Sequence, residues 1–206
     1  MTPAEYLKRL IRERPNLAVC EQDMRAAFAA LRGCFAAGGK LLLCGNGGSA
    51  ADCEHIAGEL MKGFLLKRPV RGLEHKPEVA DLVPLLQGAL PAVSLAGHPA
   101  LATAYLNDID PCMVFAQQVY GYGKPGDVLL GLSTSGGAQN VCRALRVANA
   151  LGLVTIGLTG AAGGRMKELC NVCLRVPADE TYRVQELHLP VYHTLCAMLE
   201  AEFFEE

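Results

Sequence analysis

The sequence has no apolar run approaching the roughly 20 residues that are needed to cross a bilayer. Its first residues, MTPAEYLKRLIRERP, are charged and amphipathic and lack the uninterrupted apolar core of a secretory signal. An excess of one charge is also missing: 19 Lys and Arg face 21 Asp and Glu, and no basic stripe stands out. We therefore expect a cytoplasmic protein with no nucleic-acid partner and no membrane partner.

Cysteine patterns that would build a disulfide framework or a cysteine-based zinc site are missing, although the chain has nine cysteines. Most of these thiols lie in apolar segments, where a thiol behaves as a small core residue. A disulfide framework is not expected in a cytosolic chain of this size. Cys170 and Cys173 form one CxxC, but no second CxxC or nearby histidine pair completes a zinc site. We interpret the thiols in apolar segments as core residues and the Cys170/Cys173 pair as structural.

What the chain does have is 206 residues, about half of them hydrophobic, which is enough for a single domain over residues 1–206. Five short apolar segments predict strands: 40–44, 91–95, 127–132, 153–158 and 171–176. Helical patterns alternate with them and cover 2–13, 20–37, 50–64, a stretch ending near 107, 112–121, 138–151 and 181–203. This alternation predicts a three-layer αβα sandwich of flavodoxin-like type, with a five-stranded parallel sheet and N-terminal helices.

Residues 65–90 do not follow the alternation. The segment contains three prolines and only a short amphipathic piece around Val79 to Leu86. A long loop inside a compact domain is often functional. We interpret 65–90 as an insertion that serves as a lid or as an interface arm.

Two polar loops follow predicted strands and precede predicted helices: Gly45-Asn46-Gly47-Gly48-Ser49 and Ser133-Thr134-Ser135-Gly136-Gly137. Glycines let the backbone approach a ligand, and N–H groups and hydroxyls at a helix N-terminus can surround an anion. Neither loop has the lysine of a nucleoside-triphosphate P-loop. The pair suits one phosphate on a small molecule, and ordinary glycine-rich turns are the alternative.

Two helices carry candidate chemical groups. His55 and Glu59 are four residues apart and share a helix face, where they can bind a metal, or the carboxylate can act as a base; a surface pair is the alternative. The stretch TYRVQELHLPVYHTL contains Gln185, His188 and His193. A lone histidine in an apolar helix is more often a core or interface residue, so spacing alone does not assign His193 a role.

The chain resembles the sugar isomerase (SIS) domain family, and within it the sedoheptulose 7-phosphate isomerases. The resemblance rests on four motifs in this order: GNGGS, HxxxE, STSG, and TxRxQExH followed by a histidine five residues later. The resemblance implies that Glu59 and His193 form the acid/base pair of an aldose–ketose isomerase in heptose biosynthesis. It implies zinc, one ion per subunit, on His55, Glu59, Gln185 and His193. It also implies substrate contacts from Asn46, Gly47, Gly48, Ser49, Asn107, Asp108, Ser133, Thr134, Ser135 and Gln185.

This chain departs from the family pattern at two positions: Ala138 replaces a further serine of the hydroxyl loop, and Gly63 replaces an arginine. Arg68 or Arg71 is our hypothesis for a replacement cation. Gln185 and His193 are about 12 Å apart along a regular helix. Either Pro190 kinks the helix, or the site is shared between subunits, as in the homotetramers of this family.

Two other functions stay open from sequence. One is isomerisation of another phosphosugar, because substrate length is not readable. The other is a non-catalytic SIS module that binds a sugar phosphate for regulation, since the family contains such proteins. The presence of Glu59 and His193 favours the enzyme.

Overall fold

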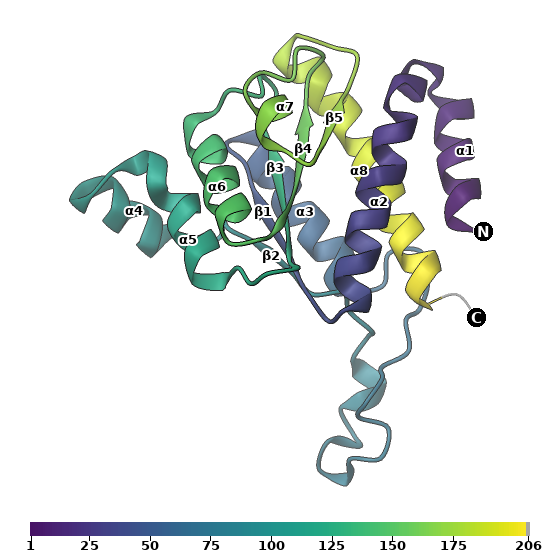
Figure 1. The fold of residues 1–206 in the computed structure, drawn as a ribbon. Helices are drawn as coiled ribbons and strands as arrows, with labels where there is room; N and C mark the ends of the chain where they lie inside the picture. Colours follow the sequence, from purple (N-terminus) through teal and green to yellow (C-terminus); the bar gives the residue numbers. More distant parts are fainter. Residues whose placement is uncertain (205–206) are drawn as a thin grey trace.

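The computed structural model describes residues 1–204 and contains a five-stranded sheet in which all neighbouring strands are parallel (Figure 1). Its strands are β1 (Leu41–Cys44), β2 (Ala92–Ser94), β3 (Val128–Leu132), β4 (Val154–Thr159) and β5 (Val172–Arg175). All five coincide with the predicted segments. Their order in the sheet, β2-β1-β3-β4-β5, is the flavodoxin-like order, so the predicted fold class is confirmed.

Helices cover both faces of this sheet. The α-helices are α1 (Pro3–Glu13), α2 (Glu21–Ala36), α3 (Gly48–Met61), α4 (Pro99–Asp108), α5 (Val114–Tyr122), α6 (Gln139–Ala150), α7 (Met166–Leu169) and α8 (Thr181–Phe204). Short 3-10 turns are η1 (Pro15–Cys20), η2 (Pro77–Val79), η3 (Val83–Leu85) and η4 (Pro111–Met113).

Strand β1 shows why both faces need a cover, because all four of its residues are buried. Successive side chains of a strand point to opposite faces. Leu41 and Leu43 pack into the apolar cluster formed with α2, α3 and α8. Leu42 and Cys44 pack into a second cluster with α5, α6 and α7. The sheet is therefore the middle layer of three.

The sheet has its topological switch point between β1 and β3. The chain leaves β1 through α3 toward β2 on one side, and leaves β3 through α6 toward β4 on the other. In open parallel sheets a crevice forms where the two connections diverge, at the carboxyl ends of the strands. Both predicted phosphate loops lie at this point.

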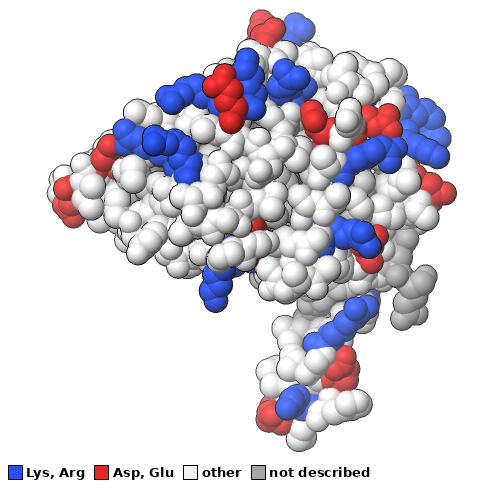
Figure 2. Space-filling view, in the orientation of Figure 1, with Lys and Arg blue, Asp and Glu red and all other residues white. Residues whose placement is uncertain are grey.

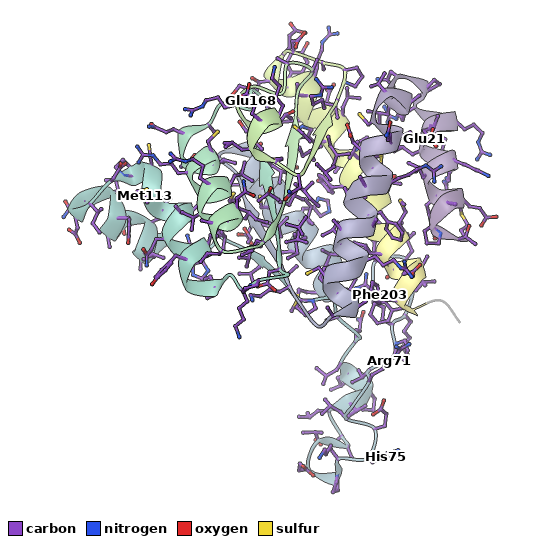
Figure 3. All side chains as sticks on the ribbon, viewed as in Figure 1. Glu21, Arg71, His75, Met113, Glu168 and Phe203 are labelled. Carbon is purple, nitrogen blue, oxygen red and sulfur yellow. The ribbon has the colours of Figure 1, made fainter. Side chains whose placement is uncertain are left out.

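The connection between α3 and β2 projects from the body of the protein as an arm (Figure 1). It holds η2 and η3, and Figure 3 shows Arg71 near its root and His75 near its tip. Three of its leucines, Leu82, Leu85 and Leu86, are exposed. On the face drawn in Figure 2, acidic and basic side chains are interspersed, on the arm as on the body. None of the described helices is long and apolar enough to span a membrane.

Candidate active site

The two predicted phosphate loops are joined by a reciprocal pair of amides. Asn46 Nδ2 donates to Asn140 Oδ1 at 2.9 Å, and Asn140 Nδ2 donates back to Asn46 Oδ1 at 2.8 Å. Asn46 belongs to the loop after β1, and Asn140 lies in the first turn of α6, after the Ser133–Gly137 loop. The pair fixes the relative position of the loops across the switch point. Sequence reasoning missed Asn140, and its place one turn past a candidate loop was the only available signal.

The loop after β3 rests on the loop after β4. Thr134 O accepts from Gly160 N at 3.0 Å, and Gly136 O accepts from Met166 N at 3.0 Å. Gly136 has a φ of +64°, and a Cβ there would lie 2.1 Å from Gly163 O. Only glycine fits this crossing. The N-cap residue of α6, Ala138, makes no side-chain hydrogen bond, and the N–H groups of Gly137 and Val141 donate to Ser135 Oγ at 3.2 Å and to Asn140 Oδ1 at 3.0 Å.

The loop after β1 packs against α8. A Cβ on Gly48 would lie 2.4 Å from Nε2 of Gln185, so the glycine leaves room for this amide. Ser49 is buried and its N–H donates to Asn46 O at 3.0 Å. The structure thus brings Gln185 to the predicted phosphate loop that contains Asn46, Gly47, Gly48 and Ser49.

His55, Glu59 and His193 form a separate cluster two turns further along α3. His55 Nε2 lies 3.1 Å from Glu59 Oε1 and 3.4 Å from His193 Nε2. Each of the three residues offers one ligand atom, and these three atoms lie within 4.8 Å of one another. The three residues are therefore a possible metal-binding group. Nitrogen and carboxylate oxygen donors are the set that zinc takes in catalytic sites.

The surroundings of the cluster orient the two imidazoles. His55 Nδ1 lies 3.0 Å from the hydroxyl of Tyr192, which donates to Asp52 Oδ1 at 3.2 Å. The ring of Phe64 lies 5.4 Å from that of His193, centroid to centroid. Burial, and then the neighbouring His55, lower the pKa of His193, so its imidazole is neutral near pH 7. Asp52 and Tyr192 were not among the sequence-based candidates.

The register of the parallel helices α3 and α8 explains why Gln185 and His193 lie in two separate places. Gln185 faces Gly48 and His193 faces His55, seven residues further along α3 and eight along α8. At 1.5 Å per residue these steps are about 10 and 12 Å. In one chain, Gln185 therefore does not join the other three predicted metal ligands.

Asn107 and Asp108 form a third location. They end α4, both are exposed, and Asn107 Nδ2 donates to Asp108 Oδ1 at 2.7 Å. Figure 1 shows α4 beside α5, on the far side of the molecule from α8. The structure does not bring these two residues to the His55 cluster of the same chain.

The suggestion that Arg68 supplies a phosphate-binding cation is wrong. Its side chain is fully buried: Nε donates to Glu200 at 2.7 Å, and the two terminal nitrogens donate to the carbonyls of Leu60 and Glu59. Arg71 Nη2 donates to Phe203 O at 3.4 Å. Phe203 is 18 residues past Gln185 on α8, about 27 Å away, so Arg71 does not reach the loops of its own chain.

His188 and the cysteines lie outside the candidate site. His188 is 0% exposed, and burial lowers its pKa to about 4, so it is a neutral core residue. All nine cysteines are free thiols, and in residues 1–204 the candidate metal group contains none of them. Six of these thiols are buried, as expected of core residues.

Comparison with known proteins agrees with this geometry. The SIS domain family model matches residues 5–75 and 73–160. A phosphoheptose isomerase of Desulfovibrio desulfuricans is 40% identical over 182 residues, which is 88% of this chain and 78% of the relative.

Two solved structures of phosphoheptose isomerases superpose on this structure. The one from Neisseria gonorrhoeae has a TM-score of 0.74 and 32% identity, and the match covers 95% of this chain and 96% of that one. The one from Francisella tularensis has a TM-score of 0.77 and 30% identity, with 95% of each chain covered. The chain therefore belongs to the phosphoheptose isomerase family of SIS domain proteins.

Proposed function

We propose that this chain is an aldose–ketose isomerase that converts D-sedoheptulose 7-phosphate to D-glycero-D-manno-heptose 7-phosphate. The observation that carries the proposal is the convergence of Glu59, His193 and His55 beside a phosphate-type crevice. The loops and the cluster are about 10 Å apart along α3, which suits an extended seven-carbon sugar with a terminal phosphate. The phosphoheptose isomerase of Desulfovibrio desulfuricans is 40% identical to this chain over 182 residues.

In the proposed reaction the loops hold the phosphate end, and this remote binding energy positions the reacting carbons. Glu59 removes the proton from the hydroxyl-bearing carbon next to the carbonyl, which leaves the negative charge on the carbonyl oxygen. Neutral His193 takes the proton of the neighbouring hydroxyl and gives it to that oxygen, by way of the enediol. Glu59 then returns its proton to the former carbonyl carbon. Each group contributes about 10² to 10⁴ in rate.

The cluster fits a zinc ion, because its nitrogen and carboxylate donors are of the kind that zinc binds and lie within 4.8 Å of one another. His55, Glu59 and His193 would hold it. Bound there, the ion supplies polarisation of the substrate carbonyl or hydroxyls. Glu59 has two carboxylate oxygens, so one can hold the ion while the other transfers the proton. The lone pair of His193 Nε2 serves either the ion or the proton.

We also propose that the active sites are shared between copies in a homotetramer. Gln185 and the Asn107–Asp108 pair lie away from the cluster of their own chain, so these predicted contacts need a second copy to reach it. Helix α4 buries none of its own residues, and Leu106 and Ile109 are exposed. In this proposal residues 1–206 are one SIS domain, and 65–90 are an insertion in it.

The test of function is conversion of sedoheptulose 7-phosphate by the purified protein, with chelator and with added zinc. Glu59→Gln and His193→Ala should each lower kcat by about 10²-fold or more. Glu54→Gln, an exposed carboxylate on the same helix, is the control and should leave kcat unchanged. Binding of the sugar phosphate without turnover would instead support a regulatory module or another phosphosugar.

The test of the shared site is subunit mixing. Gln185→Ala and His193→Ala proteins, each inactive alone, should regain activity when they are unfolded together and refolded as mixed assemblies. Mixed assemblies without activity would show that each chain builds its own site.

A further inference from the structure

Tyr192 lies between Asp52 and His55 and is 1% exposed. Its hydroxyl oxygen lies 3.0 Å from His55 Nδ1 and 3.2 Å from Asp52 Oδ1. The two partners are three residues apart on α3, whereas Tyr192 comes from α8. One hydroxyl therefore connects an imidazole of the cluster to a carboxylate outside it.

The proton count of these groups gives the direction of both hydrogen bonds. A tyrosine hydroxyl has one proton to donate, and a carboxylate only accepts. Tyr192 therefore donates to Asp52, and its oxygen is left to accept from His55. This requires the proton of the neutral His55 ring to be on Nδ1 and leaves Nε2 with its lone pair.

The unprotonated Nε2 of His55 is the atom that faces Glu59 and His193. It lies 3.1 Å from Glu59 Oε1 and 3.4 Å from His193 Nε2, both of which also present lone pairs in their unprotonated forms. Three facing lone pairs suit a shared cation. The opposite tautomer would place an N–H between the three atoms and would satisfy Glu59 internally.

We propose that Tyr192 and Asp52 are positioning residues that hold His55 in the Nδ1–H tautomer and so keep Nε2 open for a metal ion. This inference deepens the proposed function and rests on its assignment of the cluster. Asp52 has a single hydrogen-bond partner here: its other oxygen is buried and has no partner among the described residues. The carboxylate is thus committed to the Tyr192 hydroxyl.

The packing of the Tyr192 ring allows a conservative variant that tests the role of its hydroxyl. The Tyr192 ring meets His55 edge-on at 5.6 Å and His193 edge-on at 5.0 Å between centroids. Tyr192→Phe keeps these ring contacts and removes only the oxygen. Tyr120→Phe, at a 68% exposed tyrosine of α5, is the matched control.

The experiment is long-range ¹H–¹⁵N NMR of the imidazoles in full-length, metal-free protein at a pH where they are neutral. The chain has five histidines, and His55 is assigned by the loss of its signals in His55→Gln. We expect the Nδ1–H pattern for His55 in the unmodified protein and in Tyr120→Phe, and a shift toward Nε2–H in Tyr192→Phe. An Nε2–H pattern in the unmodified protein overturns the inference, whether or not the variant folds.

Zinc affinity, measured by competition with a chromophoric chelator, gives the second readout. Loss of a residue that orients a ligand typically weakens binding about 10- to 100-fold, which we expect for Tyr192→Phe but not for Tyr120→Phe. Equal affinities overturn the positioning role. If the tautomer and the affinities follow expectation while sedoheptulose 7-phosphate is not converted, the proposed function fails and this inference stands.

Discussion

Glu200 and Arg68 form a buried ion pair that we expect to be the most sensitive point of the fold outside the site. Their side chains are 1% and 0% exposed, and Arg68 Nε lies 2.7 Å from Glu200 Oε1. The carboxylate of Glu200 also accepts from the backbone N–H groups of Phe64, Leu65 and Leu66 at 2.7, 2.7 and 3.1 Å. One carboxylate thus fixes the root of the arm to α8.

Glu200→Gln removes the charge and keeps the size of the side chain. Breaking a buried pair by removing one partner leaves an uncompensated charge and costs about 3–5 kcal/mol in the free energy of unfolding. For a chain of this length that corresponds to a fall in Tm of about 10 °C. The control is Glu202→Gln, two residues further on α8, whose pair with Arg32 is exposed and worth about 1 kcal/mol or less.

Thermal and urea unfolding of the two variants check this prediction. The double variant Arg68→Met/Glu200→Leu removes the unpaired charge, but it also leaves the three N–H groups without an acceptor at about 1–3 kcal/mol each. We therefore expect this double variant to be no more stable than Glu200→Gln. If Glu200→Gln is no less stable than Glu202→Gln, the reasoning about this pair is refuted.

Three further predictions concern the loops and the core. Asn140→Ala should cost about 1 kcal/mol of stability and raise KM for the sugar phosphate more than it lowers kcat, because Asn46 loses its partner; an unchanged KM would contradict this. Gly136→Ala should lose at least 1–2 kcal/mol, about what the left-handed backbone costs, and weaken phosphate binding, read by melting and by isothermal titration. His188 has its pKa lowered to about 4 by burial, so the unfolded chain binds more protons below about pH 6.5 and stability falls as the pH drops. Urea unfolding should show about 2 kcal/mol less stability at pH 5 than at pH 7.5 from this group, a loss that is missing in His188→Leu.

The fold was predictable because its signals are local. Each strand is a short apolar run, and each of the two candidate loops combines glycines with polar side chains between a strand and a helix. The sequence also predicted that His55 and Glu59 share a helix face, and the structure places them 3.1 Å apart. These inferences need only neighbouring residues.

The parts that sequence reasoning missed depend on contacts between distant segments. Asn140 meets Asn46 across 94 residues, and Tyr192 meets His55 across 137. Arg68 was misassigned because an arginine in a proline-rich segment looks exposed, whereas its buried acceptor, Glu200, lies 132 residues away. Helix register, which separates Gln185 from the His55 cluster, is likewise set by how α3 packs on α8.

We expect that the arm can be deleted without unfolding the protein, because the chain enters and leaves it at the same place. Gly88 N donates to Arg68 O at 3.1 Å, so the chain returns to its starting point after the arm, and Leu90 N then donates to Leu60 O at 2.9 Å. The segment between these contacts, 70–86, is a closed excursion that leaves the Arg68–Glu200 pair in the body.

Replacing 70–86 by two glycines should therefore keep Tm within a few degrees and keep zinc binding, because shortening a loop changes its closure entropy by only about 1–2 kcal/mol. Melting and chelator competition measure the two quantities, with Glu200→Gln as the damaged reference. A deletion as unstable as that variant would mean that the arm supports the fold. If stability and zinc binding persist while activity and assembly size fall together, the arm acts between copies.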